Sequence, residues 1–124
     1  MGIIQYIDVV RIPVKDLKRA THFYSVGLGL DFQFELDKCS YFSLGNTQII
    51  LDSKIENTSS YLSYFLNHEK IIETVLKLSA LGAITIQQPE IYSYFKDRDQ
   101  WKAKLKDTEG NIFELTADIY NGQV

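Results

Sequence analysis

Hydrophobic and polar positions alternate on both sides of a short polar segment near the end of the chain, residues 107–111. Alternation with a period of two predicts two β-strands, and Gly110-Asn111 can adopt the positive φ that a tight hairpin requires. One face carries Trp101, Ala103, Leu105, Phe113 and Leu115, and the other carries Lys102, Lys104, Ile112, Glu114 and Thr116. Glu114 therefore lies in mid-strand, where a carboxylate needs a partner or water.

The pattern of apolar residues over 9–32 predicts a strand, a helix and a second strand. Val10, Ile12 and Val14 form one face of the first strand, and Asp16 is a suitable N-cap for the helix that follows. A stripe of apolar residues then recurs at helical spacing until Gly27 and Gly29 end the helix.

The same order of elements occurs twice along the chain. The first half predicts strands at 6–13, 31–35, 38–44 and 47–51 with a helix at 17–26; the second predicts strands at 61–66, 83–86, 101–106 and 112–117 with a helix at about 69–81. Asn67 or His68 is expected to cap the second helix, and Gly82 to end it. A polar linker, residues 53–60, joins the halves. We therefore predict one α+β domain, residues 1–124, with modules at about 1–56 and 57–124.

Two motifs bracket nearly the whole chain. The front motif is V-x-I-x-V-x-D-L with A-x-x-F-Y-x-x-x-L-G-L, from Val10 to Leu30, and the back motif is D-x-x-G-N-x-x-E-L, from Asp107 to Leu115. In this order and separation they resemble the vicinal oxygen chelate superfamily, which includes glyoxalase I, bleomycin-resistance proteins and extradiol dioxygenases. The resemblance implies two βαβββ modules whose mixed sheets curl around a shared cavity, with the helices on the outer face. It also implies a homodimer.

The resemblance implies a metal site only in part. Metal-dependent members hold a divalent ion with four side chains, mostly His and Glu, one from each of four strands. Those positions fall on Val9, on Ile49 or Ile50, within Tyr61–Ser63, and on Glu114. Because one carboxylate cannot hold such an ion alone, we expect no metal and no other cofactor.

A ligand site can nevertheless be predicted from the alternation. Helices cover the apolar face of each sheet, so Arg11 and the face of Glu114 should point into the cavity. Arg11, Lys102, Lys104 and Glu114 would then form a polar floor suited to a carboxylate, phosphate or enolate. Alternatively, the lysines mark a solvated strand face, and Glu114 and Arg11 only form salt bridges.

The long segment 87–100 is predicted to be a loop. Its aromatic residues, among them Tyr92, Tyr94 and Phe95, could close over a ligand or pack on a partner subunit or sheet edge. We include Tyr94 and Phe95 among the candidate ligand-binding residues. By contrast, Tyr61 is expected in the core, Cys39 is expected to be a buried inert thiol, and His22 should lie on a helix surface.

Composition narrows the class of protein. The 124 residues carry a net charge of -3, which gives no general attraction to nucleic acid. No stretch approaches the length needed to span a bilayer, and no secretory signal is evident at the N-terminus. A single cysteine excludes an internal disulfide framework and suits the cytoplasm.

Two function classes follow. The first is a metal-free glyoxalase or bleomycin-resistance-like protein that binds a small anionic or aromatic molecule, in resistance or sequestration. The second is an enzyme of the same superfamily, of lyase, isomerase or dioxygenase type, with Glu114 as a base or as a metal ligand, for instance together with Asp52. The sequence leaves open whether any reaction is catalysed and which ligand is bound.

Overall fold

The structure, a computed structural model, describes residues 2–55, 60–66 and 70–120. The chain divides into two compact units, Met1–Ser59 and Ser60–Val124. Each unit contains one four-stranded mixed sheet, so the predicted α+β class with two βαβββ modules is confirmed. Neither sheet closes into a barrel. The predicted caps of the second helix, Asn67 and His68, lie outside the described residues, and the shared cavity stays a prediction.

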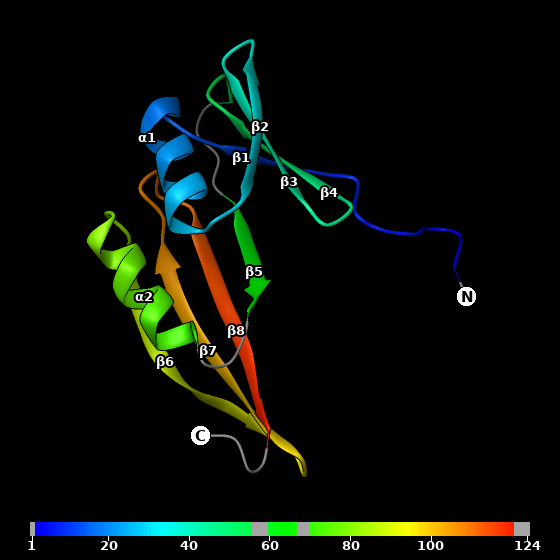
Figure 1. The fold of residues 1–124 in the computed structure, drawn as a ribbon, viewed down its shortest axis with the longest axis vertical. Helices are drawn as coiled ribbons and strands as arrows, with labels where there is room; N and C mark the ends of the chain where they lie inside the picture. Colours follow the sequence, from blue (N-terminus) through cyan, green and yellow to red (C-terminus); the bar gives the residue numbers. More distant parts are fainter. Residues whose placement is uncertain (1, 56–59, 67–69, 121–124) are drawn as a thin grey trace. The chain divides into compact units, whose positions relative to one another are not determined.

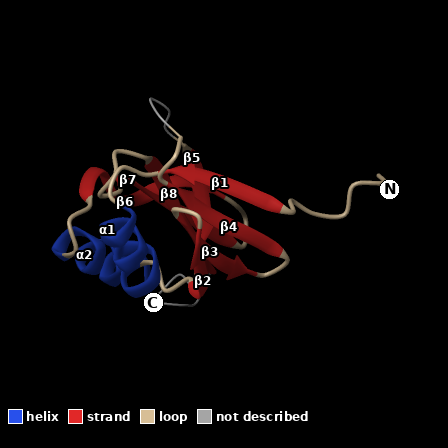
Figure 2. Cartoon of the chain, turned by 90° about the horizontal axis from the view of Figure 1, so that it is seen from above, coloured by secondary structure: helices blue, strands red, loops and turns tan. Residues whose placement is uncertain are grey.

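Unit 1 is a sheet with a helix against one face (Figures 1 and 2). Its elements are β1 (Val9–Pro13), α1 (Leu17–His22), a single π-helical turn η1 (Phe23–Gly27), β2 (Asp31–Leu36), β3 (Cys39–Leu44) and β4 (Thr47–Asp52). The strand order is β1-β4-β3-β2, with β1 parallel to β4 and the other pairs antiparallel. As predicted, Asp16 caps α1: its side chain accepts a hydrogen bond from the Arg19 N–H at 3.0 Å.

Unit 2 repeats this arrangement with longer strands. Its elements are β5 (Tyr61–Phe65), α2 (Ile71–Ala80), β6 (Ile84–Tyr94), β7 (Arg98–Lys106) and β8 (Ile112–Tyr120), in the sheet order β5-β8-β7-β6. Gly82 lies just after the end of α2 and has a φ of 108°. A Cβ added there would lie 3.2 Å from the methyl carbon of Thr108. This position therefore favours glycine on two counts.

The register shows which residues of unit 1 face the helix. Ile12, Leu51 and Ser40 form one row across β1, β4 and β3. The hydroxyl oxygens of Ser40 and Thr21, on α1, are 2.6 Å apart, so this row faces the helix. Because side chains alternate along a strand, Arg11 lies on the opposite, open face, as predicted.

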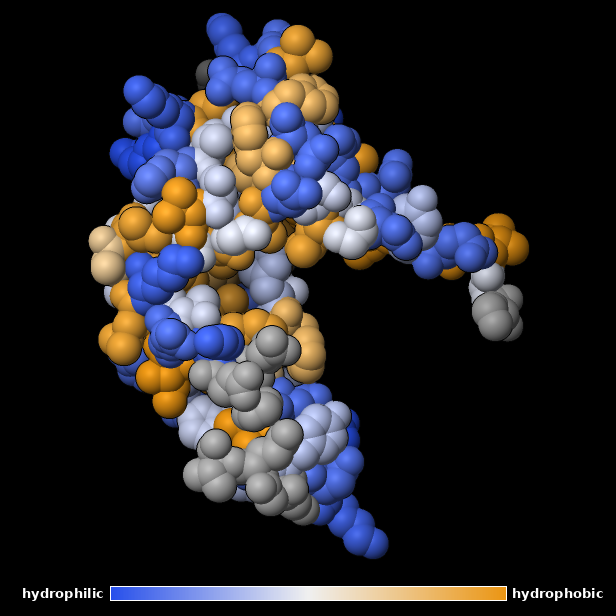
Figure 3. All heavy atoms as spheres, in the orientation of Figure 1, coloured by the Kyte–Doolittle hydropathy of each residue, from blue (hydrophilic) through white to orange (hydrophobic). Residues whose placement is uncertain are grey.

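In unit 2 the predicted faces of the last hairpin are also confirmed. Ala103, Leu105, Phe113 and Leu115 are at most 2% exposed, whereas Glu114 pairs with Lys104 in the row between them. The helix α2 buries Ile71, Val75 and Leu78. Ile72, by contrast, is 59% exposed. On the face of the molecule drawn in Figure 3, hydrophobic side chains lie among hydrophilic ones.

The predicted loop 87–100 is wrong. Most of it continues β6 and β7 as a paired hairpin, which only Phe95–Asp97 interrupt. The strand was not predicted because it contains Pro89, which has no N–H group to donate to the hydrogen bonds of a sheet. β6 tolerates this residue because it is an edge strand and because its register shifts between Gln87 and Glu90.

A buried carboxylate, Asp52, joins the end of β4 to β1. It is 4% exposed and accepts hydrogen bonds from Arg11 Nη1 and from the Lys54 N–H, both at 2.8 Å. Burial alone would raise the pKa of Asp52, but the bonds from Lys54, Arg11 and the Cys39 thiol outweigh it and lower the pKa below its usual value.

Replacing this carboxylate by Asp52→Asn should therefore lower the free energy of unfolding by about 1–2 kcal/mol at neutral pH, since Arg11 is half exposed and water replaces part of the loss. A group with a lowered folded pKa stabilises the fold above its unfolded pKa. The difference between variant and wild type should be constant above about pH 5 and shrink as the pH falls below about 4. Urea unfolding at several pH values measures it. A difference that does not depend on pH would show that the charge of Asp52 is not what stabilises the unit.

Candidate functional site

The open face of unit 2 brings together five side chains, which we call the Glu114 cluster: Tyr61, Tyr92, Lys102, Lys104 and Glu114. Glu114 lies at the centre, with its side chain 12% exposed. The Tyr61 hydroxyl donates to Glu114 Oε2 at 2.5 Å, and Lys102 Nζ lies 3.4 Å from the same oxygen. Strand β5 supplies Tyr61, and β8 supplies Glu114 from the neighbouring position in the sheet.

These contacts keep Glu114 ionised. The hydrogen bond from Tyr61 lowers the pKa of Glu114, partial burial raises it, and the charges of Lys102 and Lys104 lower it further. The net direction is downward. The contacts therefore stabilise the ionised form of the carboxylate.

Both lysines of the cluster lie over tyrosine rings. Lys102 Nζ is 4.5 Å from the centre of the Tyr92 ring, and Lys104 Nζ is 5.6 Å from that of Tyr61. Such cation–π contacts hold an ammonium group without neutralising it. Within the described part of the chain, Lys104 has no carboxylate at ion-pair distance. The cluster therefore carries two positive charges and one negative charge.

The other predicted site residues have partners of their own. Tyr94 pairs with Asp99, five residues along β7 from Lys104, which corresponds to about 16 Å of strand. Phe95 follows it in the turn, where its ring covers the Arg98 guanidinium at 4.6 Å. Arg11 belongs to unit 1, where it pairs with Asp52.

Two members of the Glu114 cluster, Tyr61 and Tyr92, were not predicted as site residues. Tyr61 was expected in the core but is 54% exposed, and Tyr92 was placed in the loop. A signal did exist for Tyr61, because the superfamily's fifth-strand ligand position falls within Tyr61–Ser63. No histidine falls within this range, and Tyr61 was therefore expected to be a core residue.

The pairing of β1 with β4 shows which of the two isoleucines lies on the same face as Arg11. Arg11 pairs with Ile50, so Ile50 rather than Ile49 shares the open face of unit 1. Over residues 2–55, 60–66 and 70–120, no three His, Cys, Asp or Glu side chains lie together in a way that could hold a metal ion. Asp52, the second ligand considered for an unusual site, is occupied by Arg11 and Lys54.

The remaining reactive side chains fit their predicted structural roles. Cys39 is 1% exposed, and burial, followed by the neighbouring Asp52 carboxylate, raises the pKa of its thiol. His22 lies exposed at the end of α1. Among the described residues, no helix has the length and apolar character needed to cross a bilayer.

Comparisons with known proteins address the fold. No protein-family model matches the sequence, and a search of curated proteins found no match. Among solved structures, hypothetical protein SA1046 from S. aureus is 26% identical, with 94% of this chain and 99% of that chain covered and a TM-score of 0.74. A glyoxalase/bleomycin resistance protein/dioxygenase family enzyme from Burkholderia phytofirmans is 20% identical, covering 89% and 96%, with a TM-score of 0.76. The fosfomycin resistance protein FosX from Listeria monocytogenes is 20% identical, covering 93% and 94%, with a TM-score of 0.74.

These similarities extend over nearly the full length of every chain. The protein therefore has the fold of the vicinal oxygen chelate superfamily, which confirms the resemblance inferred from the two sequence motifs. At these identities the likeness establishes the fold and not the activity. The homodimer and the cytoplasmic location stay predictions.

The role of Tyr61 in the cluster can be tested directly. Tyr61→Phe removes the hydrogen bond that most lowers the pKa of Glu114, so this pKa should rise toward its ordinary value. An NMR titration of the Glu114 side-chain carboxyl group measures it. Tyr64→Phe is the matched control, because Tyr64 pairs with the buried Leu115 on the other face of the sheet. An unchanged pKa in Tyr61→Phe would assign the lowering to the lysines instead.

Proposed function

We propose that the protein binds a small anionic molecule, of aromatic character, through the Glu114 cluster and without a metal ion. The proposal depends mainly on the excess of positive charge on the open face of unit 2. Lys102 shares the charge of Glu114, whereas Lys104 lies over the Tyr61 ring with no ion-pair partner among the described residues. Lys104 is therefore the group that a ligand anion would neutralise.

The tyrosine rings support an aromatic ligand. Tyr61 is 54% exposed and Tyr92 is 43% exposed, although each already contacts a lysine. An exposed ring beside an ammonium group offers both a stacking surface and a charge. An aromatic carboxylate or phosphonate would use both at once.

The alternative is an enzyme of the same fold in which Glu114 acts as a base. It is favoured by the position of Glu114 in mid-sheet, on the open face. The lowered pKa speaks against it, because a general base works best with a pKa near the working pH. A hydrogen bond and an ammonium group on one carboxylate oxygen stabilise the ionised form and reduce its basicity.

The ligand site can be tested with benzoate and phenylphosphonate as probes and neutral benzamide for comparison. Lys104→Met should weaken binding of both anions about tenfold or more, since a charge-assisted contact contributes roughly 1.5–3 kcal/mol. Benzamide binding should not change. Calorimetry or NMR titration measures the affinities. Lys77→Met removes an exposed lysine from α2 and should leave all three unchanged.

The same probes separate binding from catalysis by Glu114. Glu114→Gln removes a charge that repels the ligand, which at ~6 Å is worth roughly 0.7–3 kcal/mol between water and a protein surface, or about threefold to a hundredfold in affinity. Anion affinity should therefore rise. Loss of anion binding in this variant would favour the enzyme, with Glu114 as a ligand-contacting base or metal ligand.

The metal-free proposal has its own test. Elemental analysis of the purified protein should find well under one equivalent of zinc, nickel, manganese or iron. A chelator should leave the melting temperature unchanged, because there is no bound metal ion for it to remove. One equivalent of metal that disappears in Glu114→Gln would contradict the proposal.

A further inference from the structure

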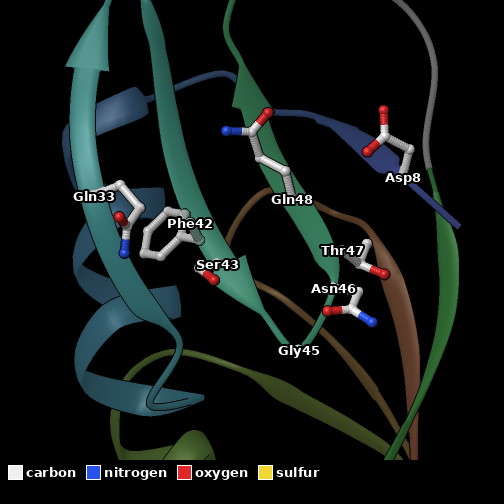
Figure 4. A pocket seen from close by; sticks show the side chains of 8 residues that line it. All are labelled: Asp8, Gln33, Phe42, Ser43, Gly45, Asn46, Thr47 and Gln48. Atoms are coloured by element: carbon white, nitrogen blue, oxygen red, sulfur yellow. The ribbon is translucent and has the colours of Figure 1, made fainter. Parts of the chain in front are cut away.

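Unit 1 contains a pocket that the Glu114 cluster does not share. It has a volume of about 360 Å³ and surrounds the end of the β3–β4 hairpin. Figure 4 shows Gln33 of β2 on one side of it and Asp8, just before β1, on the other. Its volume is within the usual range for small-molecule sites.

The lining has an unusual chemical character. Its polar side chains are amides, hydroxyls and one carboxylate, namely Gln33, Ser43, Asn46, Thr47, Gln48 and Asp8. Neither lysine nor arginine is among the described lining residues. Such a set both donates and accepts hydrogen bonds but offers no cation to an anion. It suits a ligand rich in hydroxyl groups.

Much of this hydrogen-bonding capacity is unused inside the protein. Within the described residues, the side chains of Asp8, Ser43, Asn46 and Gln48 have no hydrogen-bond or ion-pair partner. The Asp8 carboxylate is therefore available to a ligand ammonium group. By comparison, Asp52 in the same unit is occupied by Arg11.

The backbone holds these groups in place. The Gln48 N–H donates to the Asp8 carbonyl at 2.8 Å, and the Thr47 hydroxyl donates to the Ile7 carbonyl at 2.7 Å. Asp8 is thereby fixed beside the start of β4. Gln33 lies in the irregular step of β2, between Phe32 and Phe34, which are 42% and 45% exposed. Neither ring is among the lining residues, and Phe34 stacks on Tyr41 with ring centroids 4.6 Å apart, so recognition in the pocket rests on its polar groups.

We infer that this pocket binds a small polyhydroxylated molecule that carries an amine, such as an amino sugar of two rings. Asp8 and Gln33 are separated by three strand spacings, about 14 Å, which one sugar ring does not span. The amine would pair with Asp8, and the hydroxyl groups would bond Ser43, Asn46 and Gln48. This inference rests on unit 1 alone and is independent of the anion site in unit 2.

The test compares the glucosamine disaccharide with cellobiose, its neutral counterpart, by NMR titration of the whole chain. The amino sugar should bind in the millimolar range and several-fold more tightly than cellobiose. Amide shifts should concentrate at residues 45–48 and leave 102–114 unmoved, which distinguishes this pocket from the Glu114 cluster. Shifts confined to 102–114, or no shifts, would overturn the inference.

Variants locate the interaction. Asp8→Asn should remove the preference for the amino sugar, and Gln48→Leu should weaken both sugars. Asp8 is exposed, so its replacement leaves the core intact. Glu35→Gln, an exposed carboxylate of the same unit outside the pocket, is the matched control and should retain the preference. Equal loss in Glu35→Gln and Asp8→Asn would show only a general attraction of the acidic protein for amines.

Discussion

Among the described residues, each unit has one helical stretch with which to cover a four-stranded sheet, and the rest of the structure depends on this constraint. One face of the strands beneath the helix must be apolar enough to pack against it, and alternation then gives the other face a separate composition. In unit 2 the helix face is Ala103, Leu105, Phe113 and Leu115, each nearly inaccessible to water. Lys102, Lys104 and Glu114 are placed together on the other face by the same alternation. The chemistry of the open face is thus a consequence of how the core is built, and a register slip of one residue would destroy both.

The state of Glu114 shows how a charge is maintained on such a face. A carboxylate that is 12% exposed loses much of its hydration, which opposes ionisation. The bond from Tyr61 and the nearby lysines more than compensate, so the pKa falls. The compensation is uneven, because Lys102 contacts the carboxylate whereas Lys104 contacts a ring. If each lysine had its own carboxylate partner, the charges on this face would balance. With one carboxylate for two lysines, the face retains a positive charge that a ligand anion could neutralise.

Alternation made the fold and the faces predictable, and it failed where other forces decide. The face of Glu114 could be predicted because positions of lower and higher exposure alternate without interruption around it. The face of Arg11 was predicted from the alternation of residue types, although burial itself does not alternate there, since Ile12, Pro13 and Val14 are all buried. The β6–β7 extension could not, since Pro89 and the irregular pairing of an edge strand break the pattern that identifies strands. The turn Asp37-Lys38 likewise has φ values of 51° and 63° without any glycine. Tyr61 and Tyr92 were missed for a different reason: their contacts with Glu114 and Lys102 cross between strands, and pairing of distant strands is not encoded locally.

The two units show how one backbone plan can carry different chemistry. Both place a Gly-Asn pair between their last two strands, but Gly45-Asn46 closes a two-residue turn, whereas Gly110-Asn111 completes a five-residue loop organised by the Asp107 side chain. In unit 1 the short turn leaves amide and hydroxyl groups around the hairpin end. In unit 2 the Asp107 carboxylate accepts bonds from the N–H groups of Glu109 and Asn111, so the loop's own polar groups satisfy one another. The available polar groups therefore lie at the hairpin end in unit 1 and in mid-sheet in unit 2. The same order of elements thus carries a pocket lined by amides, hydroxyls and one carboxylate in unit 1, and a cluster with two lysines and one glutamate in unit 2.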